Sequence, residues 1–248
     1  MQQLILKVNK LQQLTSGIKR FEFVSPVGDD LPVFTAGAHL DFHLDNGLIR
    51  SYSLANNPEE SNRYVTAVLR EETGGGGSIY MHDNVSVGDQ LQVTGPSNNF
   101  ELVDISGTHI LLGGGIGITP LLAMGHKLKA ENRPCHLHYC TKSREETAFI
   151  EEVEEIFGDN LTFYHDGGDP SKGINLKKTI GVQTKDANLY ICGPAGLLSA
   201  ARDVTSHWTV GSVHFELFQS TKTKEEKVAE AKLDNLNQAF EVELAQSG

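Results

Sequence analysis

The pattern of apolar residues changes near residue 103, and this change predicts an all-β part followed by an α/β part. Before that point, apolar and polar residues alternate over short segments: 4–8, 21–23, 40–44, 64–69 and 91–93. A period of two is typical of strands with one buried face, and the segments between them carry turn residues, as in PVGDD and SVGD. We predict a small antiparallel β-barrel over residues 1–103.

After residue 103, continuous apolar runs alternate with helical patterns. The predicted strands are HILLGGG, CHLHYC, LTFYH and NLYIC, and the predicted helices include TPLLAMGHKLKAE and SREETAFIEEVEEIFG. Leu121 and Leu128 share the apolar face of the first helix, and Ser143 and Glu146 have capping-box spacing at the expected start of the second. Strand–helix alternation predicts a parallel sheet covered on both faces, over residues 104–219.

Charge and composition limit the partners. The formal net charge is −11, so we expect neither nucleic acid nor a membrane surface as a partner. There is no apolar run of membrane-spanning length and no signal-peptide core, which predicts a cytosolic protein, taken here as a monomer. Cys135, Cys140 and Cys192 have no disulfide-framework spacing, and His136 and His138 lack a third ligand nearby, so no metal site is predicted.

The segment GGGIGITP, residues 113–120, joins a predicted strand to a predicted helix. Each Gly costs about 0.5–1 kcal/mol of backbone entropy relative to Ala, so this density requires a reason. Thr119 can cap the helix and Pro120 suits its first turn, which would direct free N–H groups and the helix dipole at a pyrophosphate. Pro120 departs from the Rossmann fingerprint, and a tight strand-to-helix turn is the alternative.

Three other segments carry weaker signals. RSYSL, residues 50–54, offers a cation, an aromatic ring and hydroxyls for a phosphate and a flat heterocycle, although a barrel strand with an exposed Arg is the alternative. GGGGS, residues 74–78, is typical of a flexible linker or an anion site. CGPAGLL, residues 192–198, places a thiol at the carboxyl edge of the sheet, where open α/β folds bind ligands, or a buried structural Cys.

In their order and spacing, these segments together with HYCTKS and VHFELF resemble the phthalate dioxygenase reductase branch of the ferredoxin-NADP reductase family, over about residues 4–218. The resemblance implies FMN rather than FAD. It assigns the FMN site to Arg50, Ser51, Tyr52, Ser53, Val68, Gly76, Gly77, Ser78 and Phe218. It assigns the NADH site to Gly114, Gly115, Gly117, Thr119, Pro120, Thr141, Asp166, Cys192, Gly193 and Pro194. The residues that it places at the reacting rings are Ser53, Cys192 and Glu216.

The choice of nucleotide depends on the segment after HYC. Lys142 and Arg144 could pair with a 2′-phosphate, whereas Asp166 could hydrogen-bond a bare ribose if it turns inward. The family favours NADH, and NADPH is the alternative.

The resemblance implies an NAD(P)H-dependent flavin oxidoreductase, in which hydride passes from nicotinamide to flavin and the protein holds the two rings together. Its partner would be a Rieske-type mono- or dioxygenase of the O-demethylase or ring-hydroxylating class. The alternatives are a stand-alone NAD(P)H:flavin or ferredoxin reductase, and a non-catalytic flavin-binding regulatory subunit.

Reductases of this branch deliver electrons through a plant-type [2Fe-2S] domain, which requires a C-x4-C-x2-C pattern. No Cys follows Cys192. Residues 220–248 read as a charged linker followed by AFEVELAQSG, which looks like the first strand of such a domain. We therefore expect the chain to be a fragment of a reductase of roughly 320 to 330 residues, with the [2Fe-2S] cluster present only in the full-length protein.

Overall fold

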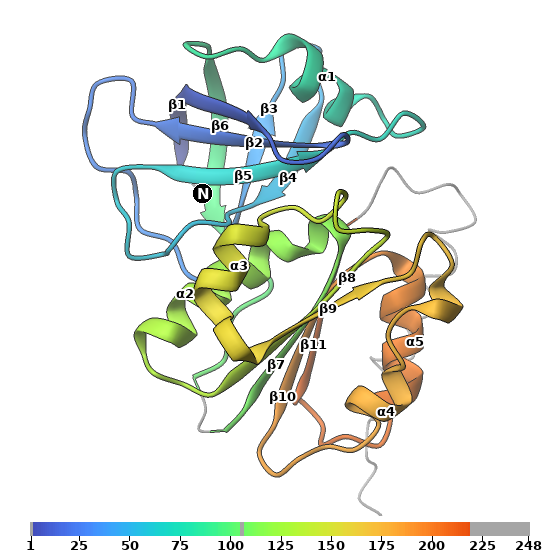
Figure 1. Ribbon diagram of the computed structural model, residues 1–248. Helices are drawn as coiled ribbons and strands as arrows, with labels where there is room; N and C mark the ends of the chain where they lie inside the picture. The colour runs from blue at the N-terminus through green and yellow to red at the C-terminus, as the bar shows by residue number, and fades with distance from the viewer. Residues whose placement is uncertain (1, 105–106, 219–248) are drawn as a thin grey trace, which may run out of the picture. The chain divides into compact units, whose positions relative to one another are not determined.

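The computed structural model describes residues 2–104 and 107–218, which form two β-sheets connected in series (Figure 1). The first is a six-stranded antiparallel sheet with the order β4-β3-β6-β1-β2-β5. Its strands are β1 (Gln3–Gln13), β2 (Ile18–Val24), β3 (His39–His43), β4 (Ile49–Ser53), β5 (Tyr64–Leu69) and β6 (Gln90–Ser97). A short helix, α1 (Gly77–Asn84), lies between β5 and β6.

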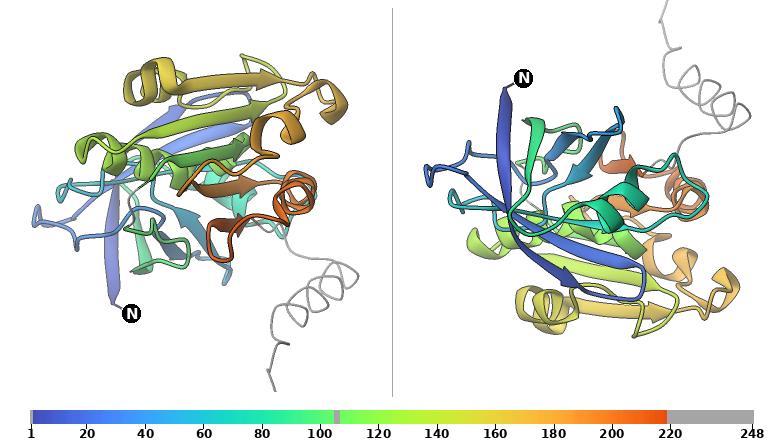
Figure 2. Two further views of the ribbon diagram at one scale, coloured as in Figure 1. Left: turned by 90° about the horizontal axis from the view of Figure 1, so that it is seen from below. Right: turned by 90° about the horizontal axis from the view of Figure 1, so that it is seen from above.

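The first sheet curls because its longest strand bends and its edge strands meet. The first half of β1 pairs with β6 and the second half with β2, with a register shift between Val8 and Lys10. The dark blue ribbon of β1 can be followed from the N-terminus in Figure 2. At the two edges, the Thr66 hydroxyl of β5 donates to the Ser53 carbonyl of β4 at 2.8 Å. Such bulges bend a strand and increase its twist, which brings the edges of a six-stranded sheet together.

The second sheet is five-stranded and wholly parallel, with the order β11-β10-β7-β8-β9. Its strands are β7 (His109–Gly114), β8 (Cys135–Thr141), β9 (Leu161–His165), β10 (Asn188–Gly193) and β11 (Val213–Leu217). The α-helices of this half are α2 (Ile118–Ala130), α3 (Ile150–Phe157), α4 (Leu176–Ile180) and α5 (Ala195–Thr205). Short 3₁₀ turns η1 (Gly115–Gly117), η2 (Gly158–Asn160) and η3 (Pro170–Lys172) complete it.

Helices cover both faces of the second sheet, with α2 and α3 on one side and α4 and α5 on the other (Figure 1). Strand β10 is buried along its whole length because its side chains serve both layers. Tyr190 and Cys192 join the core beneath α2 and α3, whereas Leu189 and Ile191 join the core beneath α4 and α5. Parallel strands covered on both faces are expected to be apolar throughout, as NLYIC is.

The buried core beneath α2 and α3 continues into the six-stranded sheet, so one cluster includes Phe21, Phe42, Leu121 and Tyr139. Helices α2 and α3 approach closely because α2 carries a Gly at the contact. A Cβ on Gly125 would lie 2.3 Å from Cζ of Phe157. Gly125, which lies within the predicted helix TPLLAMGHKLKAE, is therefore a packing residue.

The predicted fold class, an antiparallel flavin-type barrel followed by a parallel α/β sheet, is confirmed by the two sheets. The boundary between the two parts at residue 103 stays a prediction. The predicted linker and first-strand segment, residues 220–248, lie outside the described residues. Among the described helices, none combines the length and apolar character that crossing a membrane requires.

The predicted start of the helix after β8 is wrong. Helix α3 begins at Ile150, whereas the capping-box spacing placed the start at Ser143. The Ser143 carbonyl instead closes a turn, in which it accepts bonds from the Glu146 amide at 3.2 Å and from the Thr147 hydroxyl at 2.8 Å. Phe149 then adopts a left-handed conformation with φ of 59°, which separates this turn from the helix.

Candidate functional site

Arg50 lies against the second glycine loop, so the two segments that could hold a phosphate are adjacent. Its guanidinium donates to the Ile49 carbonyl at 2.8 Å and to the Gly75 carbonyl at 2.9 Å. A Cβ on Gly77 would lie 2.4 Å from Cγ of Arg50, so this position must be Gly for the Arg side chain to pass. Gly76 has φ of 79° and begins α1 without a side-chain cap. Free N–H groups at the start of α1 and a cation therefore converge.

The charge on Arg50 has no carboxylate partner among residues 2–104 and 107–218, where both of its hydrogen bonds go to main-chain carbonyls. An arginine whose positive charge is not neutralised by a neighbouring carboxylate is suited to an anionic ligand. Ser78, in the same loop, accepts a bond from the Glu71 amide at 3.1 Å, so its hydroxyl anchors the start of the loop.

Among the other residues of RSYSL, one side chain bonds to the neighbouring strand and the others pack in the core. Ser51 donates to Asp41 of β3, its cross-strand partner, at 2.5 Å. The Tyr52 ring packs on Phe42 with 5.6 Å between the centroids, and burial raises the pKa of its hydroxyl. Ser53 is buried. Of the predicted flavin residues, Ser51 is therefore turned to a protein partner.

Two other predicted flavin residues lie on the shared apolar core. Val68 of β5 is fully buried, and its carbonyl pairs with the His82 ring at 2.8 Å. Phe218 is partly buried and packs on the same cluster as Tyr52 and Cys192. The core thus brings residues from the barrel, β10 and the end of β11 to one cluster.

The first loop, GGGIG, requires glycine at different positions for two different reasons. A Cβ on Gly117 would lie 2.2 Å from the Cys192 carbonyl oxygen, and a Cβ on Gly114 would lie 2.7 Å from Cδ of Pro194. These two glycines allow the loop to pack directly on the segment Cys192–Pro194. Gly115 differs, because it has φ of 54° and no protein atom within 4 Å of its Cβ position. Space beside Gly115 is therefore open to a ligand.

Thr119 does not cap α2, contrary to the prediction. The helix begins one residue earlier, at Ile118, with Gly117 at the N-cap position and no side-chain cap. Thr119 is buried and its hydroxyl donates to the Ile116 carbonyl at 3.1 Å. Pro120 lies in the first turn, where its missing N–H costs no hydrogen bond. The Ile118 N–H already bonds the Gly115 carbonyl through η1, so the feature of this loop that suits a ligand is the open space beside Gly115.

Cys192 and Glu216 are register partners on β10 and β11, and their side chains meet at the carboxyl edge of the sheet. The Cys192 thiol donates to Oε2 of Glu216 at 3.9 Å. Burial raises the pKa of Glu216 to about 7, and the thiol hydrogen bond acts in the opposite direction. Burial and the neighbouring carboxylate together raise the pKa of Cys192, which is therefore a neutral thiol at pH 7.

Thr141 and Asp166 lie together where β8 and β9 end. The Thr141 carbonyl accepts from the Asp166 amide at 3.2 Å, and its hydroxyl contacts Thr147 at 2.7 Å and Nδ1 of His165 at 2.9 Å. The hydroxyl of Thr141 is thus already bonded within the protein. Asp166 accepts from the Gly168 amide through Oδ1 at 2.7 Å, and its side chain is partly exposed.

Sequence reasoning missed the groups that hold these residues in place. Asp41, the Gly75 carbonyl and Leu197 each fix a predicted site residue, by hydrogen bonding or by close packing. The period-two pattern of β3 and β4 could have indicated the pairing of Asp41 with Ser51. The contact of Gly114 with Leu197 joins the end of β7 to the first turn of α5 and leaves no local signal.

Comparison with known proteins gives the class of protein to which this site belongs. Residues 5–102 match the family model described as an oxidoreductase FAD-binding domain, and residues 111–203 match the oxidoreductase NAD-binding domain. The two halves thus define a reductase that uses a flavin and a pyridine nucleotide.

Individual relatives narrow this class. The chain is 41% identical to the phthalate 4,5-dioxygenase oxygenase reductase subunit of Pseudomonas putida, over 98% of this chain and 73% of the relative. It is 36% identical to a vanillate O-demethylase oxidoreductase of Acinetobacter baylyi, over 96% of this chain and 72% of the relative. The solved structure of a phthalate dioxygenase reductase superposes with a TM-score of 0.85 at 40% identity, covering 89% of this chain and 70% of that one.

The chain therefore belongs to the phthalate dioxygenase reductase branch of the ferredoxin-NADP reductase family, and it is an NAD(P)H-dependent flavin oxidoreductase. The relatives are reductase components of oxygenase systems, and the chain spans about three quarters of their length, 73% for each of the two phthalate dioxygenase reductases.

Proposed function

We propose that the chain binds FMN, takes hydride from NADH, and passes the electrons toward a Rieske-type oxygenase of the O-demethylase or ring-hydroxylating class. Three relatives are named as reductases of phthalate dioxygenase, vanillate O-demethylase and tert-butanol monooxygenase systems, which supports an oxygenase partner. The observation that carries the flavin part is the unneutralised Arg50 beside the start of α1.

This cradle suits one terminal phosphate, and we infer FMN from it. Arg50 supplies the positive charge, and the backbone of Gly76–Ser78 supplies N–H groups in a tight turn. FMN, when bound, supplies the ring that accepts the hydride. The chain's own residues have the tasks of holding the phosphate, packing Tyr52 and Phe218 near the core, and excluding water around Cys192.

The nucleotide part of the proposal rests on the open space beside Gly115, just before α2. This space suits a pyrophosphate. Asp166 supports NADH over NADPH, because a carboxylate can accept bonds from a bare ribose and repels a 2′-phosphate. Arg144, one of the two candidates for a 2′-phosphate beside Lys142, pairs with Glu154 at 3.5 Å. Open space at Gly115 argues against a regulatory subunit with a blocked nucleotide pocket.

The test compares flavins on Arg50→Gln and on the wild-type chain. We expect FMN to bind wild type more tightly than FAD or riboflavin, and Arg50→Gln to weaken FMN binding about tenfold or more while riboflavin binding stays within twofold. A lost charge-assisted bond to a phosphate is worth about 1.5–3 kcal/mol, which corresponds to such a factor.

Lys10→Gln is the control, because it removes one positive charge from β1 and keeps the glycine loop. Anaerobic NADH should bleach the bound flavin of wild type. A chain that binds no flavin, or an Arg50→Gln variant that retains full FMN affinity, contradicts the proposal.

A further inference from the structure

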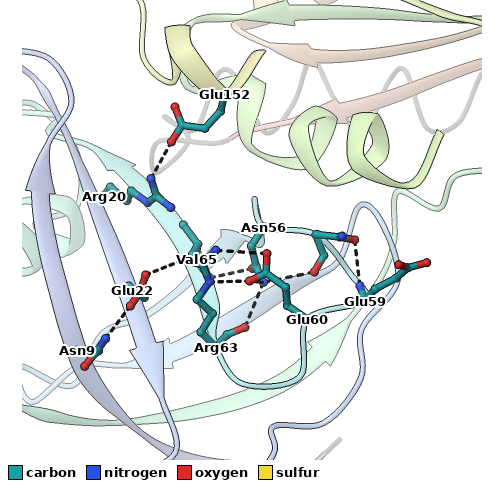
Figure 3. Close-up of polar contacts among 10 residues, drawn as sticks. Asn9, Arg20, Glu22, Asn56, Glu59, Glu60, Arg63, Val65 and Glu152 are labelled. Atoms are coloured by element: carbon teal, nitrogen blue, oxygen red, sulfur yellow. Dashed lines mark hydrogen bonds and ion pairs between the residues drawn. The ribbon is translucent and has the colours of Figure 1, made fainter. Parts of the chain in front are cut away.

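An ion pair joins the barrel to the nucleotide-binding half on the side where β2 faces α3. Arg20 of β2 donates to Oε1 of Glu152 of α3 at 2.7 Å, and the two side chains are 20% and 35% exposed (Figure 3). The Arg20 guanidinium also lies over the Phe149 ring, 5.8 Å from its centroid. One barrel side chain thus makes two contacts with the first turn of α3 and the residue before it.

Among residues 2–104 and 107–218, the side chains around this pair make their other polar bonds within one half. Arg63 donates to Glu22 at 2.8 Å and to Glu60 at 2.5 Å, all three of them in the barrel (Figure 3). Asn56 accepts from the Val65 amide at 2.9 Å, also in the barrel. The polar network therefore stabilises the barrel, and Arg20 is the member that reaches across.

A cavity of about 190 Å³ lies beside the ion pair, between the barrel and helices α2 and α3. Its lining includes both residues of the ion pair, Phe149, and Leu122 and His126 of α2. A space of this size means that the two halves are not close-packed at this point, although the shared core joins them elsewhere. The ion pair therefore adds a specific contact where that packing is incomplete.

The helices on this side carry the nucleotide site. Helix α2 begins at the GGGIG loop, and α3 follows the segment 141–149 that contains Thr141 and approaches Asp166. A shift of α3 relative to β2 would therefore move the nucleotide-binding loops relative to Arg50 and Tyr52 on the barrel. Hydride transfer requires the two rings in contact, and misplacement by about 1 Å can cost a factor of 10² in rate.

We propose that Arg20 and Glu152 are positioning residues that set the alignment of the nicotinamide with the flavin by fixing α3 against β2. This inference rests on the proposed function and extends it to residues outside the cofactor site. Neither residue is among the predicted FMN or NADH residues, so they act through the orientation of the two halves.

The experiment uses the full chain with FMN and compares Arg20→Gln, Glu152→Gln and the charge-swapped double variant Arg20→Glu/Glu152→Arg. We expect each single variant to bind FMN like wild type, and the limiting rate of flavin reduction at saturating NADH to fall about fivefold to tenfold. The double variant should recover at least half of the lost rate, because the ion pair is re-formed with reversed polarity. Lys10→Gln and Glu151→Gln, an exposed neighbour on α3, are the charge controls.

Hydrogen exchange of the same variants gives a readout that does not depend on activity. We expect β2 and α3 to lose protection together in the single variants, and to regain it together in the double variant. Single variants that reduce flavin at the wild-type rate, or a double variant no faster than the slower single, overturn the inference. If wild type itself is not reduced by NADH, the proposed function fails, and joint or separate loss of protection then decides whether the pair holds the two halves.

Discussion

Replacing Gly115 by Ala tests whether the open space in the GGGIG loop belongs to a ligand. The Cβ position of Gly115 meets no protein atom within 4 Å, so the substitution removes no packing. Its cost to the fold is the left-handed backbone, φ of 54°, which an Ala adopts at about 1–2 kcal/mol. In a protein of this size, each kcal/mol lost from the free energy of unfolding lowers the melting temperature by about 2–4 °C. The folded chain should therefore survive and keep its flavin.

Binding of NADH should suffer much more than stability. The added methyl group occupies the space we assign to the pyrophosphate, so we expect the Kd for NADH to rise at least tenfold, about 1.4 kcal/mol. Gly28→Ala is the matched control, because Gly28 has φ of 85°, has no atom within 4 Å of its Cβ position, and lies in a barrel turn. It should show the same loss of stability and an unchanged Kd.

For Gly117→Ala we expect the opposite result, a large loss of stability from a steric clash within the protein. Its Cβ would lie 2.2 Å from the Cys192 carbonyl oxygen, and both groups are backbone that cannot rotate away. Overpacking costs about 1–3 kcal/mol in ordinary cores, and we expect this variant at or above that range. Urea unfolding and fluorescence titration with NADH measure both quantities. A Gly115→Ala chain that binds NADH with wild-type affinity would refute the assignment of the open space.

Two further predictions concern carboxylates of the site. Burial raises the folded-state pKa of Glu216 to about 7 from 4.5, so wild type loses stability as pH rises through this interval. Glu216→Gln should match wild type at about pH 4, below the unfolded-state pKa, and exceed its free energy of unfolding by about 2 kcal/mol at about pH 8.5, after discounting for partial exposure; a difference independent of pH in urea titrations would contradict this. Asp166→Asn should reduce the preference for NADH over NADPH about tenfold, measured as the ratio of kcat/KM values, and an unchanged ratio would remove Asp166 from the ribose site.

Much of the fold follows from periodicity that is visible in the sequence. The strand LTFYH corresponds to β9, Leu161–His165, and the alternation of NLYIC supplies both cores of the second sheet. Such segments are predictable because each face of the strand has the same environment along its whole length, which gives a regular pattern of apolar residues. The order of strands in each sheet was not predictable in the same way, since it depends on pairings between distant segments.

The start of α3 shows where local sequence signals fail. Ser143 and Glu146 have the spacing of a capping box, yet the Thr147 and Thr141 hydroxyls bond the Ser143 carbonyl and fold the segment into a turn. One of these competing donors, Thr141, lies at the end of β8, before the segment that the helical pattern covers. The helix begins only after Phe149, whose left-handed backbone separates it from the turn.

The candidate site likewise has parts that local sequence patterns predict and parts that they do not. The sequence indicated candidate ligand-binding segments, since glycine loops and RSYSL have recognisable compositions. The link between Arg20 and Glu152 spans 132 positions and connects residue types that are common on any surface. Such a contact has no local pattern, so the sequence alone could not have predicted it.

The interlocking of Gly114 and Gly117 with Cys192–Pro194 has a consequence for protein engineering. Because a backbone carbonyl of one loop fills the space that a side chain of the other would need, neither loop can be exchanged independently. A chimera that takes residues 113–120 from one reductase and residues 192–197 from another would join two surfaces shaped by different neighbours. Transferring nucleotide specificity from one reductase of this family to another should therefore succeed only when both segments are taken from the same donor protein.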